Sequence, residues 1–126
     1  MKNVIFLSAA LLTITSCSQS KIDQYNEIID RTSRIEINYK NLNKKLELDT
    51  KQVENFKRIL KRNIDPTIQE KFIADIQIDL YDKEGRIGHL MITEFNSKPF
   101  VNFGSDDLNF GYPLTYGIGQ YLNENK

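Results

Sequence analysis

The sequence predicts an α+β domain in which helices pack on one face of an antiparallel sheet, behind an N-terminal signal peptide. Three observations indicate this fold. Segments that alternate apolar and polar residues recur along the chain, short turns separate them, and amphipathic segments with helical spacing lie before, between and after them. Strands joined by short turns pair antiparallel, and helices then gather on one face. The 126 residues suffice for one such domain and not for two.

Residues 1–16 have the organisation of a secretory signal peptide. Lys2 supplies a positive charge, the stretch from Val4 to Leu12 is almost entirely apolar, and no acidic residue precedes Asp23. The apolar stretch is shorter than the roughly 20 residues that a membrane-spanning helix needs. There are two alternative interpretations. One is an ordinary secretory signal in which the cysteine has no role, and the other is a buried N-terminal helix.

Cys17 ends the run Ile14-Thr15-Ser16-Cys17, which resembles the lipobox of bacterial lipoproteins. The resemblance implies that residues 1–16 are removed and that Cys17 becomes a lipid-modified N-terminus. Residues 17–21 would form this lipidated end and a polar tether. Stable anchoring takes more than one acyl chain, and lipoproteins of this type carry several. Because Cys17 is the only cysteine, the domain has no internal disulfide and is held together by its core.

The predicted domain spans residues 22–126 and opens with a helix and a hairpin. Residues 22–32 show helical spacing of apolar side chains. Residues 34–40 alternate strictly, which is typical of a half-buried strand. Residues 41–44 would turn the chain, and residues 46–48 mark a short return strand.

The clearest helix is expected over residues 49–62. Asp49 can cap its N-terminus, and Gln52 stands three residues later, as in a capping box. Val53 and Phe56 begin its apolar stripe. Together with the lipobox and the alternating strands, the spacing Asp49, Val53, Phe56 resembles the small lipoproteins of the Bacteroidota. This resemblance implies envelope attachment through Cys17 and brings no known activity.

The second half of the chain predicts a three-strand meander and a final helix. Residues 72–81 and 86–95 alternate around a turn, and residues 100–103 form a third strand, placed at an edge because Pro99 cannot donate to a ladder. Residues 104–111 are expected to form a polar loop. Pro113 suits the first turn of the last helix, whose apolar face consists of Leu114, Ile118, Tyr121 and Leu122.

Residues that could carry catalysis are sparse. His89, the only histidine, stands in a strand pattern without a serine or cysteine partner at motif spacing. Asp75 and Asp79 would lie on one face of a strand, but about 13 Å apart along it, which is too far for a retaining glycosidase. We therefore interpret His89 as a strand histidine and the two aspartates as part of a solvated sheet face.

The acidic run Asp106-Asp107, with Asn109 nearby, is a candidate calcium loop. It lacks the register and the distal glutamate of an EF-hand, so a turn is the preferred interpretation. We predict no catalytic residue, no metal site and no cofactor.

Aromatic residues are concentrated near the C-terminus. Phe103, Phe110, Tyr112 and Tyr116 are the candidate partner-binding residues, on the condition that they are exposed. Some of them must also supply the core.

These features favour a membrane-anchored, non-enzymatic binding module of the bacterial cell envelope. An inhibitor or immunity-type protein is one form that such a module takes. The alternatives are a structural or assembly accessory of an outer-membrane complex and, with less support, a small hydrolase. The 17 basic and 17 acidic residues balance, so we expect no nucleic-acid partner. Ser18 stands where an aspartate would favour inner-membrane retention in enterobacteria, which favours the outer membrane, with the domain in the periplasm or at the cell surface.

Overall fold

The computed structural model describes residues 17–94 and 98–126, so the expected signal peptide of residues 1–16 lies outside the described residues. Six strands form one antiparallel sheet in the order β2-β1-β3-β4-β5-β6, which confirms the predicted fold class. The elements are α2 (Cys17–Arg31), β1 (Arg34–Tyr39), η1 (Lys40–Leu42), β2 (Lys44–Glu47), α3 (Thr50–Leu60), β3 (Ile76–Tyr81), β4 (Arg86–Thr93), β5 (Phe100–Gly104), β6 (Asn109–Pro113) and α4 (Tyr116–Glu124).

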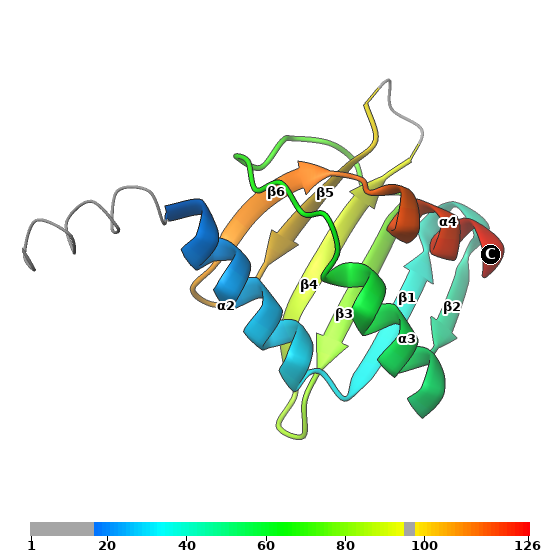
Figure 1. Ribbon diagram of the computed structural model, residues 1–126. Helices are drawn as coiled ribbons and strands as arrows, with labels where there is room; N and C mark the ends of the chain where they lie inside the picture. Colours follow the sequence, from blue (N-terminus) through cyan, green and yellow to red (C-terminus); the bar gives the residue numbers. More distant parts are fainter. Residues whose placement is uncertain (1–16, 95–97) are drawn as a thin grey trace, which may run out of the picture.

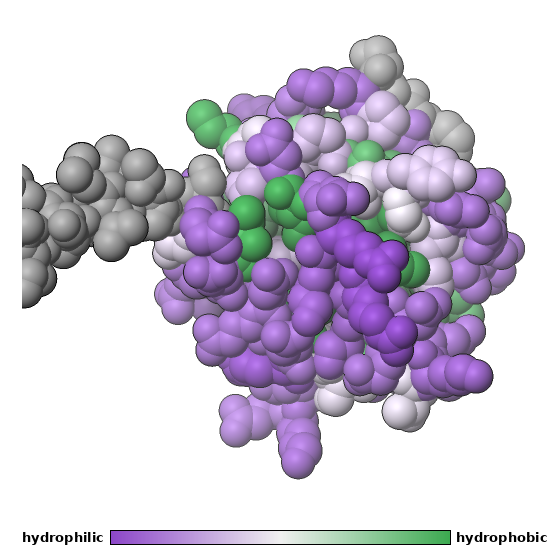
Figure 2. All heavy atoms as spheres, viewed as in Figure 1, coloured by the Kyte–Doolittle hydropathy of each residue, from purple (hydrophilic) through white to green (hydrophobic). Residues whose placement is uncertain are grey.

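The three α-helices lie on one face of the sheet, as Figure 1 shows. We call the side of the sheet that the helices cover the helix face. The core fills the space between this face and the helices, and alternate residues of each inner strand point into it. Seen from the helix side in Figure 2, the surface is mainly hydrophilic, with hydrophobic atoms in the furrows between the helices. We call the opposite side of the sheet the open face.

Helix α2 begins at Cys17 and not at Ile22, so the segment expected to be a polar tether is helical. The cause is local, because residues 17–31 contain no proline or glycine to stop the helix. Side-chain hydrogen bonds also link successive turns: Gln19 donates to Asp23 at 3.0 Å, and Gln24 donates to Ser20 at 3.2 Å.

The predicted cap of the second helix is present. The Asp49 carboxylate accepts the Gln52 backbone N–H at 2.8 Å, and the Gln52 side chain accepts the Asp49 N–H at 2.9 Å. The hairpin before it is also confirmed, with β1 and β2 joined by a short 3-10 turn that ends at Asn43 in a left-handed conformation, φ 49°.

The C-terminal part differs from the expectation. The segment expected to be a loop contains the sixth strand, β6, so β5 lies inside the sheet and β6 occupies the edge. Pro113 ends β6, and Thr115 caps α4 by accepting the Ile118 N–H at 3.3 Å. Strand β3 begins at Ile76 and not at Phe72.

Tyr25 joins α2 to the rest of the core. Its side chain is 0 % exposed, and its hydroxyl donates to the Leu60 carbonyl at 2.8 Å while accepting from the Tyr112 hydroxyl at 2.9 Å. Its ring meets Phe103, Phe110 and Tyr112 edge to face, with centroids 4.9, 5.7 and 5.9 Å away. Burial raises the pKa of both tyrosines, so both hydroxyls keep their protons.

The segment between α3 and β3, residues 61–75, passes round the edge strand β6 onto the open face, and we call it the strap. Thr67 exchanges backbone hydrogen bonds with Gly111 of β6 at 2.6 and 2.8 Å. Further along, the Asn102 side chain accepts the Glu70 backbone N–H at 3.1 Å and donates to the Glu70 carbonyl at 2.6 Å. The Phe72 ring meets the Phe100 ring edge to face. The strap therefore covers the β5–β6 part of the open face.

Gly111 permits this close approach of the strap. A Cβ at this position would lie 2.7 Å from Phe100 Cζ and 3.0 Å from the Ile68 carbonyl oxygen. We expect Gly111→Ala to destabilise the domain by about 1–3 kcal/mol, the usual cost of overpacking, as measured by urea unfolding. The matched control is Gly119→Ala in α4, where the nearest atom would lie at 3.5 Å and the helix should gain about 0.5–1 kcal/mol. Equal stability of the Gly111→Ala variant and the native chain would contradict the packing of the strap.

Candidate functional site

Among the described residues, no helix or strand covers the open face over β2, β1, β3 and β4 as far as Met91, and we call this area the polar half. The register of the sheet places alternate residues of these strands on it, opposite the core positions. All of them are exposed or half-buried. They are Lys45 and Glu47 of β2, Arg34, Glu36 and Asn38 of β1, Gln77, Asp79 and Tyr81 of β3, and Arg86, His89 and Met91 of β4.

Charges of both signs alternate across the polar half. Arg86 pairs with Asp79 at 3.2 Å, and Gln77 donates to the same carboxylate at 3.1 Å. Arg34 lies 4.0 Å from the ring centroid of Tyr81. A hydrogen bond to Glu36, together with burial, raises the pKa of the Tyr81 hydroxyl, so this tyrosine stays neutral and can donate. The surface thus offers donors, acceptors and an aromatic ring side by side.

His89 lies in the polar half, opposite Asp79 on β3 and Gly104 on β5. A Cβ on Gly104 would lie 2.7 Å from the imidazole, so the ring rests against the backbone of β5. Burial and the nearby Arg86 lower the pKa of His89, and Asp79 opposes them. The imidazole is therefore neutral at pH 7, as expected of a strand histidine.

This lowered pKa gives a stability effect of known sign. The unfolded chain takes up the proton first, so stability should fall as the pH drops below about 6.5 and level off below the folded pKa. His89 is the only histidine, so an NMR titration of its ring protons reads the folded value directly. We expect a pKa below 6.5 that rises in Arg86→Gln. A pKa at or above the ordinary value would contradict the packing of the ring.

The two aspartates considered for paired catalysis have separate partners. Asp75 accepts hydrogen bonds from the Thr93 hydroxyl at 3.2 Å and the Glu94 backbone N–H at 2.9 Å. Asp79 is held by its arginine and glutamine neighbours. The two carboxylates therefore bond to different partners, and these contacts do not join them into a pair.

The aromatic expectation needs correction. Phe103, Phe110 and Tyr112 are 0, 1 and 0 % exposed, because the β5–β6 hairpin turns them onto the helix face around Tyr25. They do not meet the condition of exposure, and they cannot touch a partner of the folded domain. Only Tyr116 is exposed, at 82 %.

Tyr116 borders a groove of about 430 Å³ between the end of α3 and the start of α4. Ile59 and Leu114 form part of its apolar lining, while Arg62 and Asp65 bring opposite charges to its rim. Because this lining combines apolar side chains with charges of both signs, it does not favour one class of ligand.

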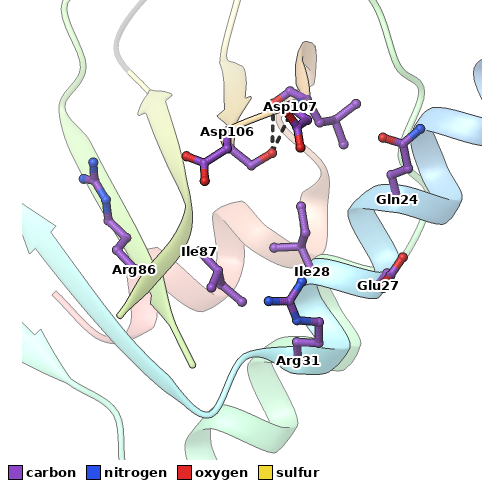
Figure 3. A pocket seen from close by; sticks show the side chains of 10 residues that line it. Gln24, Glu27, Ile28, Arg31, Arg86, Ile87, Asp106 and Asp107 are labelled. Carbon is purple, nitrogen blue, oxygen red and sulfur yellow. Dashed lines mark hydrogen bonds between the residues drawn. The ribbon is translucent and has the colours of Figure 1, made fainter. Parts of the chain in front are cut away.

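A second cavity, of about 250 Å³, lies between α2, the start of β4 and the β5–β6 loop. Figure 3 shows Glu27 and Arg31 of α2, Arg86 of β4, and Asp106 and Asp107 of the loop around it. Each arginine already pairs with an aspartate elsewhere, at 3.1 and 3.2 Å. The cavity is therefore of mixed charge.

The acidic loop itself is a tight turn. The Ser105 N–H donates to the Leu108 carbonyl at 2.9 Å, and the Ser105 hydroxyl accepts the Leu108 N–H at 3.1 Å; the latter bond is among those drawn in Figure 3. Asp106 and Asp107 are exposed. Over residues 17–94 and 98–126, no group of three or more histidine, cysteine, aspartate or glutamate side chains is placed to hold a metal ion.

Cys17 is the first residue of α2, so the direction of this helix sets where Cys17 lies relative to the core. The sequence offers the sheet face as an alternative partner surface to the aromatic loop, but it does not delimit the polar half. Alternation in one strand shows which residues are polar, not which strands lie side by side. Its signal in the sequence is the set of polar positions in residues 34–40, 77–81 and 86–91.

Within the part of the chain that the structure describes, no helix is both long and apolar enough to cross a membrane. The chain matches no protein-family model, no curated protein and no solved structure.

Proposed function

We propose that this chain is a lipid-anchored binding module of the bacterial cell envelope, and that the polar half of its open face docks a protein partner. The observation that carries the proposal is this half-sheet of alternating charges, which is free of covering elements among the described residues. Interface surfaces are enriched in aromatic, methionine and arginine side chains, and the polar half contains Tyr81, Met91 and Arg34 among its hydrogen-bonding groups.

The dimensions of the polar half suit a protein and not a small molecule. Four strands spaced about 4.8 Å apart and about 20 Å long make a patch about 20 Å on each side. Such a patch has a projected area of about 400 Å², which is about half of the ~800 Å² that each partner contributes to a standard interface, and residues around its rim would supply the rest. Arg34 and Tyr81 supply the side-chain types that most often dominate binding energy.

The anchor is the second part of the proposal. The lipobox run ending in Cys17 supports lipid attachment, and the lack of an aspartate after it supports the outer membrane. A tethered domain that presents one docking surface suits an inhibitor or immunity-type role, in which it blocks an enzyme or toxin that reaches the envelope.

Crosslinked capture from the chain's own envelope tests the proposal. We expect the native protein to recover one partner in near-stoichiometric amount, identified by mass spectrometry, and Gln77→Arg to lose it. Arginine keeps a donor near Asp79, so the fold should tolerate the change, while the added charge and bulk disturb docking. The matched control is Lys51→Glu on the exposed side of α3, which should capture normally.

The identity of the partner separates the two envelope roles. A secreted or foreign enzyme supports inhibition, and a resident outer-membrane component supports the accessory role. Equal recovery by Gln77→Arg and the native protein would rule out the polar half as the docking surface.

A further inference from the structure

The start of α2 limits how far the domain can stand from a membrane. The helix runs without a break from Cys17, and Tyr25 is fully buried in the core. Eight helical residues rise only about 12 Å. A lipid on Cys17 would therefore be joined to the core by a rigid element, and it would fix which part of the domain faces the bilayer.

That part is the β6 edge of the sheet. The ring of Tyr25 contacts Phe110 and Tyr112 of β6, so the N-terminal half of α2 lies over this edge. The strap is bonded to the same strand through Thr67 and Gly111. Figure 1 shows the first turn of α2 and the strap at the same end of the molecule, with β2 at the other.

The strap presents an apolar side chain at this end. Ile68 follows the strand bridge at Thr67 and is 87 % exposed. Figure 2 shows hydrophobic atoms projecting from the strap beside the start of α2. A single exposed isoleucine is ordinary on a soluble surface, but here it stands at the edge to which the anchor helix leads. Burial of this side chain in lipid would add to the hold of the acyl chains.

We propose that the β6 edge of the domain rests on the bilayer that holds the lipid on Cys17, with Ile68 in contact with that bilayer. The inference rests on the proposed function, because it needs the lipid anchor. Its consequence is an orientation: the β2 edge points away from the membrane, and the polar half of the open face stands clear of the lipid and accessible from the side.

The absence of tryptophan from the sequence makes a direct test possible. In Ile68→Trp the new indole is the only one in the chain, and its emission reports contact with lipid. The matched control is Leu42→Trp, since Leu42 is also apolar and 55 % exposed but lies between β1 and β2, at the opposite edge. Each full-length, acylated variant is reconstituted into phosphatidylethanolamine and phosphatidylglycerol vesicles with and without lipid brominated near the headgroup.

The expected result is a blue shift of the Ile68→Trp emission and its quenching by brominated lipid, with the Leu42→Trp emission unchanged. Equal quenching of both variants, or of neither, in protein that floats with the vesicles would overturn the orientation and leave the anchor standing. Protein that carries no lipid by intact mass and does not float would refute the anchor and the orientation with it. Matching thermal unfolding of the two variants serves as the folding control.

Discussion

Replacing Tyr25 by alanine is expected to lower the free energy of unfolding by about 3–5 kcal/mol. The change removes a fully buried ring that meets three other rings edge to face. It also leaves the Tyr112 hydroxyl and the Leu60 carbonyl without the partner they share. Urea unfolding followed by circular dichroism measures the loss, which is a large part of the 5–15 kcal/mol that stabilises a typical domain.

Tyr25→Phe separates the ring from the hydroxyl. It keeps the edge-to-face packing and loses only the two hydrogen bonds, so we expect a cost of about 1–3 kcal/mol. If Tyr25→Ala cost no more than Tyr25→Phe, the ring contacts would not be what holds α2 to the core. The rigid link between Cys17 and the domain would then lose its basis.

Cys17→Ala is expected to lose its lipid and, when a cleavable secretory signal replaces residues 1–16, to move from the membrane fraction to the soluble fraction. The physical reason is that acyl chains supply about 0.8 kcal/mol of membrane affinity for each buried methylene. The structure shows no membrane-spanning helix among residues 17–94 and 98–126 that could replace them. Cell fractionation with an alkaline wash, and intact mass of the purified protein, measure the change.

Ser18→Ala is the control for Cys17→Ala, because it alters the neighbouring position and leaves the thiol in place. This variant should stay in the membrane fraction with its lipid. A Cys17→Ala protein that still carried lipid by intact mass, or that resisted the alkaline wash after complete removal of its signal, would contradict anchoring through this residue.

The sequence predicted those parts of the fold in which local pattern and global fold agree. The capping box at Asp49 and Gln52 and the alternation of residues 34–39 were both confirmed. In these segments the residue types that favour the element also place its apolar side chains on the core.

The sixth strand was missed because its residues are typical of turns. Gly111 and Pro113 both argue against a strand when read alone. The strand forms because Phe110 and Tyr112 fill the core beneath α2, while Gly111 leaves room on the other face for Phe100 and the strap. These contacts join residues far apart in the sequence, and no local pattern reveals them.

In the candidate site, too, the local sequence identifies the residue types, and the tertiary fold decides where they lie. The sequence identified Phe110, Tyr112 and Tyr116 as aromatic, but only the hairpin register decides that the first two point inward and the third outward. In the same way, Asp79 and Arg86 were predicted to be polar strand residues. Their pairing across β3 and β4 depends on the fold.

The central claim is that the polar half of the open face is the docking surface of an anchored domain. The most direct test places a photo-crosslinking amino acid at Gln77 in the polar half, and in a second variant at Asn55, which is exposed on α3 on the opposite side of the sheet. After irradiation of intact cells, we predict one discrete adduct from position 77 and none from position 55. An adduct from position 55 with none from position 77 would contradict the claim.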